Sequence, residues 1–181
     1  MRKKLLWITE TAVMLALLVS LQWITKPMGQ LVTGSFVNAV LAVTVLVAGL
    51  SSGITVAFIS PVLAYLLKIA PQILTVPAIM VGNTVYAVLL YFLAEKDSKQ
   101  IVRQLVAWIA AAGAKFAVLY AIVVWLICGV FAENLLSSGM LKMPMLTALP
   151  ATFSWTQLFT ALIGGGVALL IVPVLRKALR K

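Results

Sequence analysis

The sequence lacks histidine, and its 181 residues include one cysteine and only four acidic residues. Without a histidine or a second cysteine, a zinc cluster has no set of ligands, and an intramolecular disulfide is impossible. Glu10 is the one acid inside a predicted span, so none of the spans carries the pair of carboxylates that general acid and base catalysis uses. These absences argue against an enzyme, and no cofactor is expected.

Apolar residues are what the sequence has in abundance. Hydrophobic residues make up 64% of the chain, charged residues 10%, and the mean hydropathy is +1.15, which lies far outside the balance of a soluble domain. A spanning helix needs about 20 mostly apolar residues, so this length accommodates about six spans. The sequence therefore predicts an all-α integral membrane protein, a bundle of six transmembrane helices forming a single domain over residues 1–181. We expect the spans at Leu5–Ile24, Phe36–Leu50, Ile54–Leu67, Val76–Ala94, Leu105–Cys128 and Trp155–Leu175.

The connections between these spans are predicted from polar and turn-forming residues. The basic start resembles a secretory signal, but Glu10 interrupts the apolar run and no small-residue cleavage site follows, so we expect the first span to be retained. Thr25–Ser35 is predicted as a long polar loop, and Ser51–Gly53 as a tight turn. Gly129–Ser154 is predicted as an extended connection before the last span.

The net charge of +10 is better explained by membrane topology than by nucleic acid, because the cations lie at the ends of apolar segments rather than on a soluble basic face. Lysine and arginine concentrate in cytoplasmic loops. One predicted side holds Arg2, Lys3, Lys4, Lys96, Lys99, Arg103, Arg176, Lys177, Arg180 and Lys181, whereas the other holds only Lys26, Lys68 and Lys142. This asymmetry predicts that both termini are cytoplasmic. The lipid bilayer is thus an expected partner, and nucleic acid is not.

Lys115 lies near the middle of the fifth predicted span, in AWIAAAGAKFAVLYAIVVW. A lysine at this depth in lipid costs about 2.5 to 3.5 kcal/mol, so it should face the protein interior or a watery cavity. Two interpretations stay open: a packing lysine that bonds carbonyl groups or reaches an interface, or an anchor for a polar or anionic group of a ligand. Its helical neighbours Val118, Leu119 and Ile122 are apolar, so a partner must come from another helix or from a ligand.

Other polar side chains fall in the outer halves of predicted spans. Together with Lys115 they describe a mostly apolar pocket with a few polar groups, which is the usual composition of a small-molecule site. The alternative is that they only hold helices together through interhelical hydrogen bonds. The candidate substrate-binding residues are Asn38, Asn83, Tyr86, Lys115, Trp155, Gln157 and Thr160.

Small residues recur at two places where helices could approach closely. Ala12, Ala16 and Ser20 follow one another at four-residue spacing in the first span, which gives a flat face for another helix, either a partner's or one of this chain. Gly164–Gly166 in the last span indicates close packing or a local bend.

The chain resembles the substrate-binding S component of an energy-coupling factor (ECF) vitamin transporter. The resemblance lies in the six-span pattern, the TAVMLALLVS segment of the first span, the long loop predicted after it and the extended connection before the last span. GSFVNAVLAV and PAIMVGN are also similar to segments of this group. The resemblance implies a pocket that opens outward and binds one vitamin or precursor, in a bacterial plasma membrane.

The resemblance also implies partners. Such a subunit has no ATPase of its own, which agrees with the lack of a P-loop motif, and it works with a transmembrane coupling subunit and two ABC ATPases. The family's docking motif for the coupling subunit corresponds here to Ala12 and Ala16. The alternative function is a small structural or scaffolding membrane protein without a ligand.

Overall fold

A computed structural model of the chain describes residues 2–69, 72–94 and 101–179, and all regular structure in these ranges is helical. Within these ranges, five helical segments are long and apolar enough to cross a membrane, and one further apolar helix is shorter. The prediction of an all-α membrane protein is therefore confirmed. The six main helices are α1 (Arg2–Thr25), α2 (Gln30–Val43), α3 (Leu50–Leu66), α4 (Val76–Leu93), α5 (Ile101–Leu119) and α8 (Trp155–Ala178).

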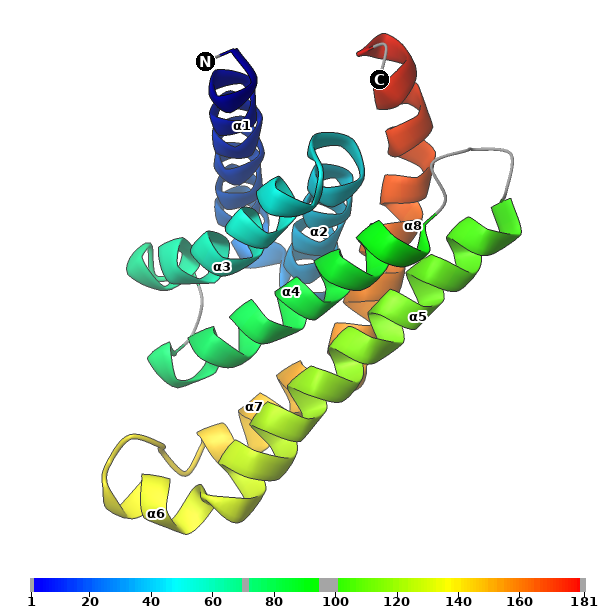
Figure 1. Cartoon of the computed structure of the whole chain (residues 1–181). Helices are drawn as coiled ribbons and strands as arrows, with labels where there is room; N and C mark the ends of the chain where they lie inside the picture. The colour runs from blue at the N-terminus through cyan, green and yellow to red at the C-terminus, as the bar shows by residue number, and fades with distance from the viewer. Residues whose placement is uncertain (1, 70–71, 95–100, 180–181) are drawn as a thin grey trace.

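Several short elements extend or connect these helices. Two π-helices, η2 (Thr44–Ala48) and η4 (Tyr120–Val130), continue α2 and α5 directly, whereas 3₁₀ turns η1 (Lys26–Met28) and η3 (Ile73–Thr75) precede α2 and α4. The expected connection between η4 and α8 contains two short helices, α6 (Ala132–Ser137) and α7 (Met145–Phe153). Figure 1 shows the two termini at one end of the molecule and α6 and α7 at the opposite end.

The position of the termini agrees with an even number of crossings, and the positive-inside rule assigns their end of the molecule to the cytoplasm. Of the cations behind that prediction, Lys96, Lys99, Arg180 and Lys181 lie outside the described residues. The opposite end, which contains the α1–α2 connection and α7, then faces the exterior.

The core lies where α2 crosses α8 and where α4 packs between α3 and α5. Small residues bring these helices together. A Cβ atom on Gly164 would lie 2.7 Å from the Ala39 amide nitrogen, and one on Gly165 would lie 2.8 Å from the Tyr86 hydroxyl and collide with the Trp108 indole. The close packing predicted for this glycine run is confirmed.

The predicted loop at Thr25–Ser35 is wrong, because α2 already begins at Gln30. The chain reverses direction within the 3₁₀ turn and at Gly29, whose φ of +88° favours glycine. Thr33 therefore belongs to a helix, where it is buried in the protein.

The tight turn predicted at Ser51–Gly53 is also wrong, since these residues form the first turns of α3. The turn lies at Gly49, with φ of +97°. Ser52 and Gly53 are small for a different reason: Ser52 is hydrogen-bonded to the Thr11 hydroxyl at 2.9 Å, and a Cβ atom on Gly53 would lie 2.8 Å from Val45 Cβ.

Candidate functional site: a polar cavity around Lys115

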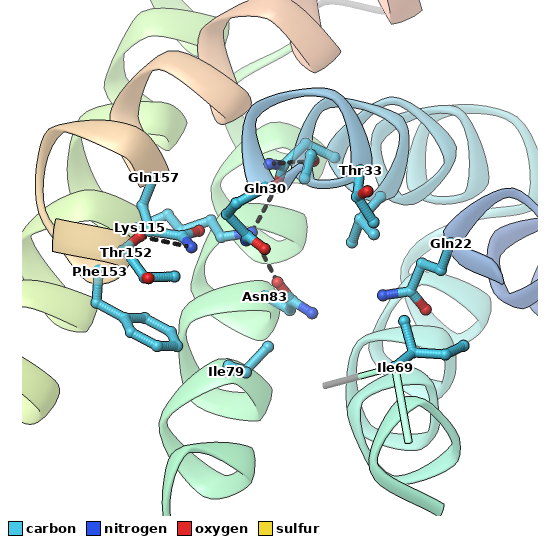
Figure 2. A pocket seen from close by; sticks show the side chains of 13 residues that line it. Gln22, Gln30, Thr33, Ile69, Ile79, Asn83, Lys115, Thr152, Phe153 and Gln157 are labelled. Carbon is cyan, nitrogen blue, oxygen red and sulfur yellow. Dashed lines mark hydrogen bonds between the residues drawn. The ribbon is translucent and has the colours of Figure 1, made fainter. Parts of the chain in front are cut away.

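A cavity of about 90 Å³ lies between the helices, toward the end of the molecule that is opposite the termini. Its wall combines amide and hydroxyl groups, one ammonium group and apolar side chains (Figure 2). The residues come from α1, α2, α4, α5, α7 and α8 and from the segment after α3: Gln22, Gln30, Thr33, Gly34, Val37, Asn38, Ile69, Ile79, Asn83, Lys115, Thr152, Phe153 and Gln157.

Lys115 is the centre of the hydrogen-bond network in this wall. Its side chain is 2% exposed, as expected for a lysine at this depth, and its Nζ donates to Asn38 Oδ1 at 2.6 Å and to Asn83 Oδ1 at 2.7 Å. Distances this short are typical of charge-assisted hydrogen bonds. The Nζ also lies 5.5 Å from the centre of the Tyr86 ring, within the range of a cation–π interaction.

Asn38 is oriented by partners other than the lysine. Its Nδ2 donates to the Gly34 carbonyl at 2.9 Å and to Thr160 Oγ1 at 3.2 Å, which leaves its amide oxygen for Lys115. Thr160 can approach because Gly34 has no side chain: a Cβ atom there would lie 2.8 Å from Thr160 Cγ2. The Thr160 hydroxyl donates in turn to the Gln157 carbonyl at 3.0 Å. Asn38 is thus fixed between α2 and α8.

The amides account for the presence of a cation at mid-membrane depth. Hydrogen bonds to a charged group are worth about 1.5 to 3 kcal/mol each, so the two bonds to Lys115 are comparable with its insertion cost of about 2.5 to 3.5 kcal/mol. An ammonium group has three hydrogens, and these two bonds engage two of them. Within the described part of the chain, no acidic residue lines the cavity.

Two of the predicted binding residues lie behind the cavity wall rather than in it. Tyr86 is fully buried beneath Lys115, with its hydroxyl 3.4 Å from the Ala161 carbonyl. Thr160 is also fully buried and contacts Asn38. Neither lines the cavity, but each contacts a residue that does: Thr160 contacts Asn38, and the Tyr86 ring contacts Lys115.

Among the predicted site residues, Trp155 lies apart from the cavity. It is 64% exposed, does not line the cavity, and stacks on the Phe116 ring with 5.5 Å between the ring centres. The reason is helical geometry: Trp155 lies two residues before Gln157, about 200° around α8, so the two side chains leave the helix on different faces. Gln157 is buried and lines the cavity.

Gln22 and Thr33 are cavity residues that the sequence reasoning missed. Thr33 falls in the predicted loop at Thr25–Ser35, whereas in the structure it belongs to α2 and its hydroxyl donates to the Thr25 carbonyl at 2.8 Å across the α1–α2 turn. Gln22 lies near the end of α1, and its Oε1 atom is buried without a hydrogen-bond partner among the described residues. An amide close to the end of an apolar span was the available signal.

The small residues of α1 lie away from the cavity. Ala12, Ala16 and Ser20 are exposed, whereas Thr11 and Leu18 form the buried side of the helix. Only 11% of the membrane-spanning window of α1 is buried within the protein. Internal packing therefore does not explain this stripe of small residues.

The helical fold defines a multi-pass membrane protein, and a polar cavity lies among its helices. A family model described as "ECF transporter, substrate-specific component" matches residues 7–176. The chain belongs to this family, and it is accordingly a membrane subunit of a transporter that determines substrate specificity rather than an enzyme. Comparisons with curated proteins and with solved structures gave no significant match.

Proposed function

We propose that this chain captures a vitamin or vitamin precursor in the cavity around Lys115 and releases it to the cytoplasm when it is coupled to a transmembrane coupling subunit and two ABC ATPases. The observation that carries this proposal is the cavity itself, in which an ammonium group and several amides converge among apolar side chains. Membership of the family supports the transport role. A purely structural role for the polar residues would not require a cavity beside them.

The place of the cavity supports capture from outside the cell. Its wall includes Gln22 near the end of α1, Gln30 at the start of α2 and Phe153 at the end of α7. These helix ends lie on the side opposite the termini, which the positive-inside rule assigns to the exterior of a plasma membrane. The cavity is smaller than the roughly 300 to 1,000 Å³ typical of ligand pockets. A vitamin-sized compound therefore enters only when wall side chains move apart.

The exposed face of α1 is the proposed contact with the coupling subunit. Ala12, Ala16 and Ser20 present little side-chain volume there, so a partner helix can approach the α1 backbone closely. Ala16→Trp should abolish uptake by the complete transporter and leave ligand binding by the purified subunit unchanged. Leu17→Trp is the matched control, because Leu17 is also exposed but lies about 100° around the helix. Equal loss of uptake in both variants would count against this contact.

Ligand binding is tested by filling the cavity. The protein is purified in detergent, co-purifying compounds are sought by native mass spectrometry, and a vitamin panel is tested by thermal shift. A ligand at 100 times its Kd should stabilise the protein by about 2.7 kcal/mol. Ile79→Trp places an indole at the cavity wall and should remove both the bound compound and the shift.

Val81→Trp is the control for this experiment. Val81 is on the same helix, is 43% exposed and does not line the cavity, so the same enlargement should leave binding intact. If the wild-type protein carries no compound and responds to no member of the panel, the scaffold alternative is favoured. If Ile79→Trp binds as tightly as wild type, the ligand lies elsewhere.

A further inference from the structure

We propose that the cavity selects a compound with an anionic group at one end, bound by Lys115, and a hydrogen-bond donor at the other end, bound by Gln22. This inference rests on the proposed function, because it specifies the chemistry of the ligand for the same cavity. It follows from two features of the wall: among the residues that the structure describes, its cation has no counterion and one of its acceptors has no donor.

The anionic end follows from the charge of the wall. Lys115 is 2% exposed, and its two partners, Asn38 and Asn83, are amides that donate or accept hydrogen bonds but do not neutralise charge. The described acids are Glu10 and Glu133, and neither lines the cavity. A buried charge is strongly stabilised by an opposite charge that also forms a hydrogen bond. A carboxylate would supply both, and it would accept the ammonium hydrogen that the amides leave.

The donor end follows from Gln22. Its Oε1 atom is buried and unpartnered in the described part of the chain, and leaving an acceptor in that state is unfavourable. Gln22 lines the cavity with its amide nitrogen toward the middle and its oxygen toward Ile69 (Figure 2), so an N–H or O–H group of a ligand reaches this oxygen once the amide turns about its last side-chain bond. Figure 2 shows Gln22 on the opposite side of the cavity from Lys115 and Gln157. A single compound can therefore occupy both ends only if its two polar groups are separated.

The middle of the cavity is apolar on one side. Ile79 contributes its side chain to the wall between the two polar ends, and Phe153 contributes its ring on the side of Lys115 and Gln157 (Figure 2). This arrangement favours a flat or apolar centre in the ligand, because a polar centre would lose hydration there without gaining partners. A compact aromatic or heterocyclic ring bearing a carboxylate and a distant amino or hydroxyl group has all three properties.

Aminobenzoates are suitable probes because each feature can be removed separately. We would measure, by isothermal titration calorimetry, the binding of 3-aminobenzoate, 4-aminobenzoate and 4-aminophenylacetate to the purified full chain. The corresponding primary amides lack the charge, and benzoate and phenylacetate lack the donor. The best acid should bind about 10- to 100-fold more tightly than its amide, and about 2- to 10-fold more tightly than the acid without the amino group.

Two variants assign these differences to residues. Lys115→Met removes the ammonium group and should reduce the preference for acid over amide to less than about 3-fold, whereas Lys142→Met, an exposed lysine outside the cavity, should leave it unchanged. Gln22→Met removes an unpartnered acceptor, so the fold should tolerate it. It should lower the affinity for the aminobenzoate and leave that for benzoate unchanged. If Lys115→Met does not fold, the wild-type ratio of acid to amide affinity still tests the anionic end, and the Gln22→Met measurement still tests the donor end.

Each outcome has one meaning. Equal binding of acid and amide, or a preference that persists in Lys115→Met, would overturn the anionic end. An amino-group effect that persists in Gln22→Met would overturn the donor end. If no probe binds but an uncharged compound of the vitamin panel does, this inference fails while the proposed function stands. If neither probes nor panel compounds bind, both fail.

Discussion

Asn38 and Asn83 both accept a hydrogen bond from Lys115, but replacing them should not cost the same. Asn83→Leu removes one charge-assisted bond, worth about 1.5 to 3 kcal/mol. Asn38→Leu removes an equivalent bond and also those to the Gly34 carbonyl and to Thr160 Oγ1. Neutral bonds within membrane bundles average about 0.6 kcal/mol, so Asn38→Leu should lower the free energy of unfolding by about 1 kcal/mol more than Asn83→Leu.

The measurement is reversible unfolding in mixed detergent and dodecyl sulfate micelles, followed by tryptophan fluorescence. Asn134→Leu is the matched control, because this exposed asparagine of α6 is outside the network, and its replacement should change stability by less than about 0.5 kcal/mol. In a Lys115→Met background, Asn83→Leu should cost less than it does alone, since no buried charge then remains to lose a partner.

Two results would refute this reasoning. One is an equal loss of stability in Asn38→Leu, Asn83→Leu and Asn134→Leu, which would mean that the network contributes nothing specific. The other is strict additivity of Asn83→Leu with Lys115→Met, because two groups joined by a short charge-assisted bond must be coupled.

Two further predictions concern helix packing. Gly165→Ala should destabilise the fold by about 1 to 3 kcal/mol in the same unfolding assay, because its Cβ atom would collide with Trp108. Gly166→Ala is the control and should cost less, because the nearest contact of its Cβ atom would be 3.4 Å. Equal losses of stability in the two variants would contradict the packing described. Thr11→Val should cost about 0.6 kcal/mol by removing the 2.9 Å bond to Ser52 between α1 and α3, and an unchanged midpoint in Thr11→Val would show that this bond is not stabilising.

Long apolar runs located the helices well, since hydropathy over about 20 residues reports membrane insertion directly. The ends of α2 and α3 were predicted poorly. At Gln30 and Ser52, polar or small residues were interpreted as loop and turn, although they face a cavity or a close helix crossing. Composition alone does not distinguish a polar residue in a loop from one in a helix that faces a polar interior.

The hydrogen-bond partners of Lys115 could be predicted in part from the sequence. A cation at the depth of Lys115 needs partners, so amides on other helices were sensible candidates, and Asn38 and Asn83 are indeed its acceptors. Which amide reaches it depends on helix rotation and crossing, which the sequence does not encode locally. The same limitation explains why the sequence alone does not separate Trp155, which lies outside the cavity, from Gln22, which lines it.

A crystal structure of the full chain with its co-purifying compound bound would show most directly whether the cavity around Lys115 is the binding site. We expect density for the compound between α1, α2, α4 and α5, with one of its acceptor atoms within hydrogen-bond distance of Lys115 Nζ. Density for the compound in the apolar groove that Leu31, Phe36 and Ile163 line on α2 and α8, with Lys115 still closed off by Asn38 and Asn83, would contradict it.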